Sequence, residues 1–362
     1  MPMVPPFPLI DLSGAPRDRG RQYGEAAAER IRRSADIYLT AFGKQHLGPD
    51  RVRALVDTLL PIIERFEPAY LEEMRGIAEG ARCPLEHIVV VNARTELLAQ
   101  ARLAAAEPDG CTGVVVLPEA SGAAVIHAQN WDWRAECAET GVVLRIRRDD
   151  GPALLTFTEA GGLARCGLNA AGIGLTANFL GSDRDGQRPG VPLVLLRRRV
   201  LESAHFALAI QAVYATPKWV SNNVMLSHAG GAALDIESAP DDSFLLQPDA
   251  GLLVHANHFE HPSALTKLRD TGLATTPDSA YRAQRVRGLL APKRGQIDSA
   301  DVKSALFDDF GTPFSVCRPP RPAATGDNLS ASVMMVVMQP AEGWMDICPL
   351  PALQREFTRY TL

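Results

Sequence analysis

The chain has 362 residues, of which 46% are hydrophobic and 22% are charged. This is an ordinary globular composition that excludes global disorder, and the length suits one large layered domain or two average ones. The formal net charge of −5 argues against a general nucleic-acid-binding protein, so we expect no nucleic-acid partner.

Helical periodicity dominates the first hundred residues. Apolar side chains recur at helical spacing over 18–42 and 52–63, and a third helix is predicted over 70–77. Beyond residue 111 the pattern changes to short β-rich runs separated by Gly, Pro and Asp. These runs predict antiparallel strands at 114–117, 124–128, 142–146, 154–158 and 173–177.

The second half of the chain repeats this alternation. Helices are predicted over 191–213 and 277–290, and strands over 224–236, 252–254 and 333–338. We interpret the arginines at 197–199 as a solvated helix face, and the proline-rich stretch 319–322 as a surface loop. The order of helices, strands, helices and strands favours an α+β fold with helices outside stacked sheets, similar to a four-layer αββα sandwich. We expect a single domain over 1–362.

Segment 1–6 lacks the basic and apolar regions of a secretory signal, and no apolar run is long enough to span a bilayer. We therefore expect a cytoplasmic protein without a membrane partner. The six cysteines form no CxxC pair, which disfavours a zinc ribbon and a dense disulfide framework. Cys137, Cys166, Cys317 and Cys348 are interpreted as packing residues.

The change from helical to β-rich pattern falls at Cys111, after the turn-rich segment 107–110. Gly110 can adopt strained backbone angles at little steric cost, which would expose its carbonyl to attack by the Cys111 sulfur. Such an attack would exchange the peptide bond for a thioester that water can hydrolyse. The new N-terminal amine, with a pKa of about 8, could then serve as base for its own thiol.

Several motifs accompany this cysteine. They are Ile-Asp-Leu-Ser-Gly at 10–14 followed by Gly20 and Gly24, Gly-Cys-Thr at 110–112, Gln-Asn-Trp-Asp-Trp at 129–133, Gly-Leu-Asn-Ala-Ala-Gly at 167–172 with Asn178, and Val-His-Ala-Asn-His-Phe at 254–259. In order and spacing the chain resembles the acyl-coenzyme A:isopenicillin N acyltransferase family. These are autoproteolytic N-terminal nucleophile (Ntn) enzymes related to the cholylglycine hydrolases.

The resemblance implies an Ntn-hydrolase sandwich cut between Gly110 and Cys111 into a 1–110 α-chain and a catalytic 111–362 β-chain. Cys111 would be the nucleophile, and Asp132 would orient and stabilise the new α-amine. Asn257 would donate its side-chain amide to the oxyanion. A backbone N–H near Asn178 would be the second donor.

Similarity to the cholylglycine hydrolases makes Arg282 a candidate for supporting the nucleophile, since an arginine near a thiol favours the thiolate. Arg318 matches a later family segment and, like Trp133, is a candidate substrate contact. The alternative for Trp133 is core packing beside Asp132. The chain has Gln129 where the bile-acid branch has arginine, so bile-salt specificity does not transfer.

The expected activity is cleavage or transfer of the acyl group of a small amide through a Cys111 thioester, without a cofactor or metal. Hydrolysis is favoured over transfer. One alternative is a non-catalytic binding protein that keeps the fold with its cysteine in the core. The other is a metal-dependent amidohydrolase that uses His255, His258 and His261, although their spacing on a strand and loop does not place three imidazoles on one face.

Overall fold

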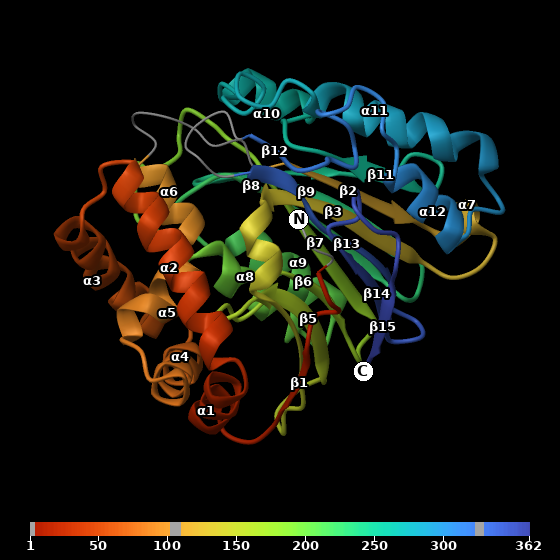
Figure 1. Ribbon diagram of the computed structural model, residues 1–362. Helices are drawn as coiled ribbons and strands as arrows, with labels where there is room; N and C mark the ends of the chain where they lie inside the picture. Colours follow the sequence, from red (N-terminus) through yellow and green to blue (C-terminus); the bar gives the residue numbers. More distant parts are fainter. Residues whose placement is uncertain (1–3, 102–109, 323–328) are drawn as a thin grey trace.

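The computed structural model describes residues 4–101, 110–322 and 329–362. Two β-sheets pack against each other, and helices lie on their outer sides (Figure 1). Helices α8 (Leu193–Leu201) and α9 (Phe206–Ala215) contact one sheet, while α11 (Ser279–Leu290) and α12 (Ser299–Leu306) contact the other. The expected α+β four-layer sandwich is confirmed.

The first sheet has eight strands and is antiparallel except at one edge, where β1 and β4 pair in parallel. Its order is β1 (Leu9–Leu12), β4 (Gly141–Ile146), β5 (Leu154–Glu159), β6 (Cys166–Asn169), β7 (Ile173–Phe179), β8 (Asn222–His228), β9 (Ala232–Ala239) and β10 (Asp242–Leu246). Strand β1 therefore brings the N-terminal part of the chain into a sheet formed otherwise by residues beyond 140.

The second sheet has seven strands. Its order is β11 (Leu252–His255), β2 (Gly110–Val116), β3 (Ile126–Arg134), β13 (Leu329–Gln339), β14 (Trp344–Pro349) and β15 (Thr358–Thr361), with β12 (Arg321–Pro322) also paired to β13. Strand β2, which begins at the expected cleavage site, lies between β3 and β11 and is buried along its whole length. Its position is fixed by two neighbours that lie far apart in the sequence.

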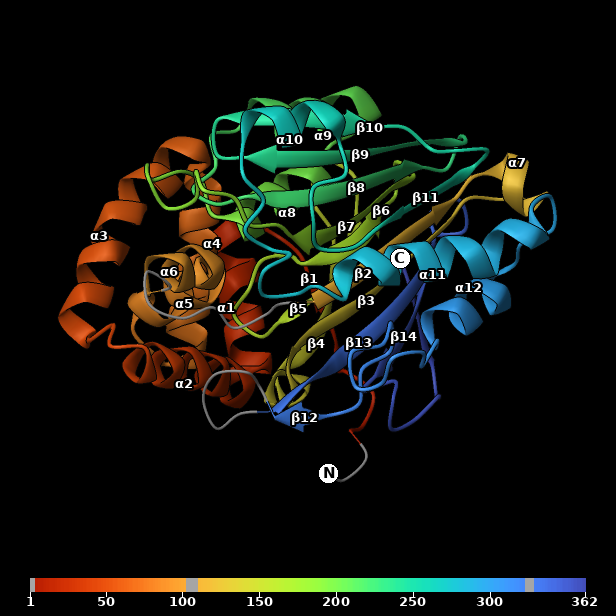
Figure 2. The ribbon, with the colours of Figure 1, turned by 90° about the horizontal axis from the view of Figure 1, so that it is seen from above.

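Six helices form a lobe on one side of the sandwich (Figures 1 and 2). They are α1 (Pro16–Ala26), α2 (Ala28–Lys44), α3 (Pro49–Phe66), α4 (Pro68–Ala81), α5 (Leu85–Asn92) and α6 (Arg94–Ala101). The remaining short helices are α7 (Pro118–Ser121), η1 (Ala135–Glu139), α10 (Pro262–Lys267) and η2 (Ala291–Lys293). No helix in the described ranges combines the length and apolar character needed to cross a bilayer.

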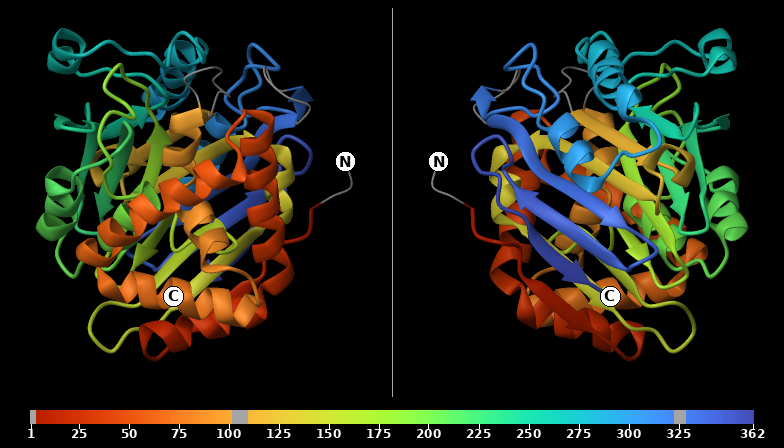
Figure 3. Two further views of the ribbon diagram at one scale, coloured as in Figure 1. Left: turned by 90° about the vertical axis from the view of Figure 1, so that its left-hand side faces the viewer. Right: turned by 90° about the vertical axis from the view of Figure 1, so that its right-hand side faces the viewer.

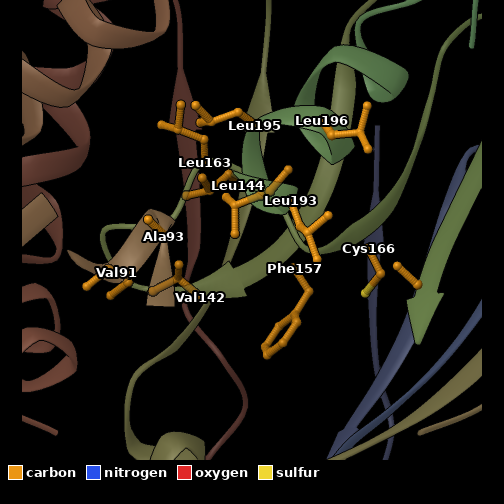
Figure 4. Packing of buried hydrophobic residues seen from close by; sticks show 14 of the residues in the cluster. Val91, Ala93, Val142, Leu144, Phe157, Leu163, Cys166, Leu193, Leu195 and Leu196 are labelled. Carbon is orange, nitrogen blue, oxygen red and sulfur yellow. The ribbon is translucent and has the colours of Figure 1, made fainter. Parts of the chain in front are cut away.

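A shared core joins the helical lobe to the eight-stranded sheet. Figure 4 shows Val91 and Ala93 of the lobe in the same cluster as Val142 of β4, Phe157 of β5 and Leu193 of α8. All are buried, so the lobe and the sandwich share one hydrophobic interior. Removal of this apolar surface from water is the main favourable term that holds the two parts together.

Three predicted elements are divided in the structure. The helix expected over 18–42 breaks at Ala27, and the one over 191–213 breaks between α8 and α9. The strand expected over 224–236 is a hairpin of β8 and β9, where Gly231 supplies the positive φ of the turn. The stretch 319–322 is not entirely a loop, because its last two residues form β12.

Helices α1 and α4 touch along a seam of four glycines, and the left view of Figure 3 shows this lobe from outside. A Cβ at Gly20 would overlap the Glu73 carbonyl, and one at Gly76 would overlap the Arg17 carbonyl. Gly24 and Gly80 extend the same seam. The small residues thus allow backbone-to-backbone contact that no larger side chain would permit.

This seam predicts an asymmetry between two glycine substitutions. Gly76→Ala should lower the free energy of unfolding by about 1–3 kcal/mol, because backbone atoms cannot yield to the added methyl group. Gly43→Ala is the matched control, since nothing lies within 4 Å of its added Cβ and alanine favours the helix by about 0.5–1 kcal/mol. Urea denaturation measures both. Equal stability of the two variants would contradict a direct backbone contact between α1 and α4 at Gly76.

Candidate active site

Cys111 occupies the second position of β2 and its side chain is fully buried. Its backbone N–H donates to Asn257 Oδ1 at 2.7 Å, just beyond the end of β11. Cys111 is paired with Trp131 on β3, and Gly110 is paired with Asp132. Because paired residues of an antiparallel ladder share a face, Cys111 and Trp131 lie on one face and Asp132 lies on the other.

Asp132 is fully buried beside Gly110. Its Oδ1 accepts a hydrogen bond from Ser332 Oγ at 2.5 Å, and its Oδ2 lies 3.2 Å from Arg318 Nε as an ion pair without hydrogen-bond alignment. A Cβ on Gly110 would lie 2.6 Å from Asp132 Oδ2 and 2.5 Å from Arg318 Nη1. Only glycine therefore fits at the residue before Cys111 without moving this pair.

Arg282, on the first turn of α11, is fully buried and holds the Cys111 backbone. Its Nη1 donates to the Cys111 carbonyl at 2.6 Å and to Thr112 Oγ1 at 2.7 Å, and its Nη2 donates to Asn257 Oδ1 at 2.8 Å. Its Nε donates to Asp278 at 2.7 Å. The two terminal nitrogens of the guanidinium thus position the strand and the Asn257 loop, while Nε is held by Asp278.

Asp278 joins the two arginines, because its Oδ2 also accepts from Arg318. Burial alone would raise the pKa of Asp278, but the guanidiniums of Arg282 and Arg318 outweigh it and hold that pKa below its usual range. Sequence reasoning missed Asp278. Its spacing of four residues from Arg282 at a helix start was a visible signal.

The side-chain amide of Asn257 has a fixed orientation. Its oxygen accepts from Cys111 N–H and from Arg282, so its Nδ2 points away from both and donates to the Phe179 carbonyl at 2.9 Å. The structure therefore brings Asn257 next to the end of β7, where Asn178 lies. The Asn178 side chain bonds to Gln129 and the His255 carbonyl, and its backbone lies opposite Asn223 in the ladder between β7 and β8.

Arg165, just before β6, has its side chain at the Cys111 sulfur. Its Nη2 lies 3.8 Å from Cys111 Sγ, and its Cζ lies 3.8 Å from the centre of the Trp131 ring. The sequence assigned the arginine near the nucleophile to Arg282, whose hydrogen bond to Cys111 goes to the backbone carbonyl. We find no local sequence signal that would have selected Arg165.

Trp133 and Arg318 occupy different environments. Trp133 is buried with its Nε1 donating to Tyr38 Oη at 3.0 Å, and Arg318 is fully buried between Asp132 and Asp278. A contact of either residue with substrate stays a prediction. In the structure Trp133 packs in the core, and Arg318 pairs with two carboxylates.

Similarity to known proteins identifies the family. A family model described as acyl-coenzyme A:6-aminopenicillanic acid acyl-transferase matches residues 119–349. The chain belongs to this family. A curated relative, the acyl-coenzyme A:6-aminopenicillanic-acid-acyltransferase 40 kDa form of Emericella nidulans, is 29% identical over 321 residues, which are 85% of this chain and 84% of the relative. The resemblance inferred from the motifs is confirmed.

Similar solved structures include two bacterial hydrolases. A penicillin V acylase from Agrobacterium tumefaciens is 17% identical, with 70% of this chain and 86% of that chain covered and a TM-score of 0.47. A mutant of the conjugated bile acid hydrolase from Clostridium perfringens is 12% identical, with 69% and 92% covered and a TM-score of 0.48. The family assignment rests on the match to the family model, which begins after Cys111.

The three histidines of the alternative metal site have separate partners. His255 Nε2 binds Glu237 at 2.8 Å, His258 Nδ1 binds Ser279 at 2.8 Å, and His261 accepts from Ser263 N–H at the start of α10. Within 4–101, 110–322 and 329–362, no group of three or more His, Cys, Asp or Glu side chains is arranged to hold a metal. The imidazoles therefore serve hydrogen bonding in the region around Asn257.

Four of the other cysteines have the environment of packing residues. Burial raises the pKa of the Cys166, Cys317 and Cys348 thiols to about 12 and raises that of Cys137 as well. A thiol of this kind stays protonated at neutral pH, so these four side chains are poor nucleophiles.

The buried pair of His255 and Glu237 predicts a pH-dependent stability. Burial opposes the charged imidazole, but the carboxylates of Asp235 and Glu237 outweigh it and raise the pKa of His255 to about 9. Because this folded-state pKa lies above the unfolded value, the stabilisation is complete below about pH 6.5 and is lost as the pH rises through about 9. Since burial raises the pKa of Asp235 to about 7, its carboxylate is mostly ionised at pH 7.5, where His255→Gln should lower the free energy of unfolding by about 2 kcal/mol.

The measurement is thermal unfolding of both proteins across pH 6 to pH 10, where the two stability curves should converge. His205→Gln is the control, since His205 is exposed and its side chain makes no cap hydrogen bond. A stability difference for His255→Gln that stays constant with pH would show that the imidazole is neutral in the folded state.

Proposed function

We propose that the chain is an Ntn amidase or acyltransferase that cuts itself between Gly110 and Cys111 and then uses Cys111 as nucleophile. The observation that carries the proposal is the hold on the Cys111 backbone, whose N–H and carbonyl bind Asn257 and Arg282 while Asp132 and Arg318 enclose the preceding glycine. A core cysteine in a strand needs none of these buried polar groups. Residues 1–110 and 111–362 would be the two processed chains.

Self-cleavage would begin when Cys111 Sγ attacks the Gly110 carbonyl carbon. The C–N bond breaks as the nitrogen takes up a proton, and the Gly110 acyl group moves to sulfur as a thioester. Water then hydrolyses the thioester, which releases the Gly110 carboxylate and restores the thiol. The same Cys111 nitrogen, no longer an amide, becomes the α-amine of the catalytic chain.

In turnover the α-amine would take the proton of its own thiol, and the thiolate would attack the carbonyl of an amide substrate. Asp132, which faces the Gly110 position, supplies a negative charge beside the resulting ammonium. Asn257 Oδ1 already accepts from this nitrogen, and its Nδ2 is directed toward β7. That orientation suits donation to an oxyanion, with a backbone N–H near Asn178 as second donor.

The thioester formed in turnover would be resolved by water or by an amine. The two outcomes differ only in which acceptor reaches the acyl group, so one site supports hydrolysis and transfer alike. We favour hydrolysis of a small-molecule amide, at a carbon–nitrogen bond other than an ordinary peptide bond. The fungal relative is named for transfer from acyl-coenzyme A to 6-aminopenicillanic acid, which makes transfer the second outcome to test.

Cys111→Ala tests both roles of the sulfur. This variant should remain a single 362-residue chain with no amidase activity, since it lacks the nucleophile for cleavage and for turnover. Cys348→Ala, which removes a buried thiol on β14, should be cut and active. Intact mass and a panel of N-acyl amides, with mass spectrometry of the trapped acyl adduct, provide the readout. A fully active enzyme that retains one uncut chain would refute the proposal.

Asn257→Asp separates the acceptor of Asn257 from its donor. The carboxylate can still accept from the Cys111 nitrogen and Arg282, but it cannot donate to an oxyanion. Processing should persist while kcat falls about a hundred- to a thousandfold with little change in KM. Asn257→Ala should lose kcat similarly and also melt at a lower temperature, because Arg282 loses an acceptor. A kcat for Asn257→Asp within a few-fold of wild type would exclude the donor role.

A further inference from the structure

A cavity of about 530 Å³ lies at the C-terminal end of α9. Three segments line it: the loop 184–189 beyond β7, residues 214–218 at the end of α9, and residues 240–243 at the turn from β9 to β10. Binding sites for small organic molecules measure roughly 300–1,000 Å³, so the volume suits such a ligand. Asn257, Arg165 and Arg282, which contact Cys111, do not line this cavity, so it is a second candidate site.

Backbone contacts hold the walls of the cavity together. The Val191 N–H donates to the Pro217 carbonyl at 2.9 Å, and the Lys218 N–H donates to the Pro240 carbonyl at 3.4 Å. A Cβ on Gly190 would lie only 2.4 Å from the Lys218 carbonyl carbon, so the end of the loop passes directly against this residue. The three segments are thus joined to each other without a ligand, and a preformed site binds at a lower cost in entropy.

Lys218 places a buried charge at the cavity. It is only 4% exposed, and no described residue forms a hydrogen bond or an ion pair with its ammonium group. Burial lowers the pKa of Lys218 to about 8, so about nine in ten of these side chains are still charged at pH 7. A buried ammonium without a partner is costly, and an anion that entered the cavity would relieve this cost.

The carboxylates at the cavity are occupied by other cations. Asp241 Oδ1 lies 2.9 Å from Arg184 Nη1, and Asp242 Oδ2 lies 2.8 Å from Lys267 Nζ. Neither carboxylate therefore compensates Lys218, and its charge is left for a ligand.

The other walls give the cavity an apolar lining. Pro189, Pro217 and Pro240 have no N–H group to donate, and the ring of Tyr214, which is 55% exposed, is available to cover an apolar group. Arg188 also lines the cavity, but it is exposed, and a charge in contact with water contributes little to pairing. The buried ammonium of Lys218 is therefore the main electrostatic feature.

We propose that this cavity binds a small organic acid, whose single carboxylate pairs with Lys218 while its apolar body packs between the prolines and Tyr214. The carboxylate would form a charge-assisted hydrogen bond that is stronger in this enclosed site than in water. A phosphate dianion fits less well, because it favours a helix N-terminus or a guanidinium fork, and the carbonyl groups at the C-terminal end of α9 carry partial negative charge. The proposal needs no chemistry at Cys111.

The first experiment compares the binding of 2-naphthoate and 2-naphthamide to the full chain by isothermal titration calorimetry. The two probes have the same shape and differ in charge. The wild type should bind the acid at least about tenfold more tightly than the amide, and Lys218→Met should remove this preference. Lys293→Met is the matched control, since it removes an exposed lysine that is paired with Asp301, and it should keep the wild-type preference.

Three results would overturn the proposal: equal affinities for the acid and the amide, a preference that persists in Lys218→Met, and no binding of the acid at concentrations up to about 1 mM. Tighter binding of 2-naphthyl phosphate than of 2-naphthoate would also overturn it, because the site would then recognise a dianion. The titrations require neither cleavage nor turnover, so an uncut or inactive chain gives the same answer.

The second experiment tests the apolar wall and the unpaired charge separately. Tyr214→Ala removes a mostly exposed ring and should weaken 2-naphthoate by about two- to tenfold. Leu208→Ala, at an exposed position of α9 that does not line the cavity, should have no effect. Without ligand, Lys218→Met should melt at a higher temperature than wild type, because a buried unpaired charge is gone. A lower melting temperature for Lys218→Met, or equal effects of the two α9 variants on binding, would contradict the assignment.

Discussion

The carboxylate of Asp278 is the common partner of two buried arginines on which the arrangement around Cys111 depends. Arg282 extends from it to the Cys111 carbonyl and to Asn257, and Arg318 extends to Asp132 beside Gly110. The positive charges of Arg282 and Arg318 are thus balanced by the carboxylates of Asp278 and Asp132 on this side of the seven-stranded sheet. Removing one member of such a network leaves an uncompensated buried charge. The network therefore strongly favours the one arrangement in which all four charges are paired.

The two faces of β2 thus differ in charge: one is neutral and the other is cationic. The outer face carries the balanced network that holds the backbone of the proposed cleavage site. The inner face carries the sulfur with the guanidinium of Arg165, which forms no ion pair with another described residue. Because side chains alternate along a strand, a single residue separates a rigid, neutral support from a cationic environment suited to developing or incoming negative charge.

The sequence predicted the layered fold and the position of most site residues, because local period and motif order carry that information. Hydrogen bonds join Cys111, Asn257 and Arg282, and Asp132 lies opposite Gly110, while the catalytic roles that the motifs implied stay predictions. The predicted boundaries of long helices were wrong where tertiary contacts determine the end of a helix, as at Ala27 between α1 and α2. Arg165 was missed, and Arg197 and Arg198 were wrongly expected on a solvated face, for a similar reason: burial here depends on packing against distant segments.

Strand β1 gives the N-terminal part of the chain a role that is independent of the chemistry. It pairs in parallel with β4, and Asp11 on it binds Arg145. Without β1 the strand at the rim of the eight-stranded sheet would be β4, whose Val142, Val143 and Leu144 are buried. An open rim of that kind is a template for aggregation. The segment ahead of Cys111 therefore also acts as a protective edge, which the rest of the chain would still need if the proposed cleavage separated the two.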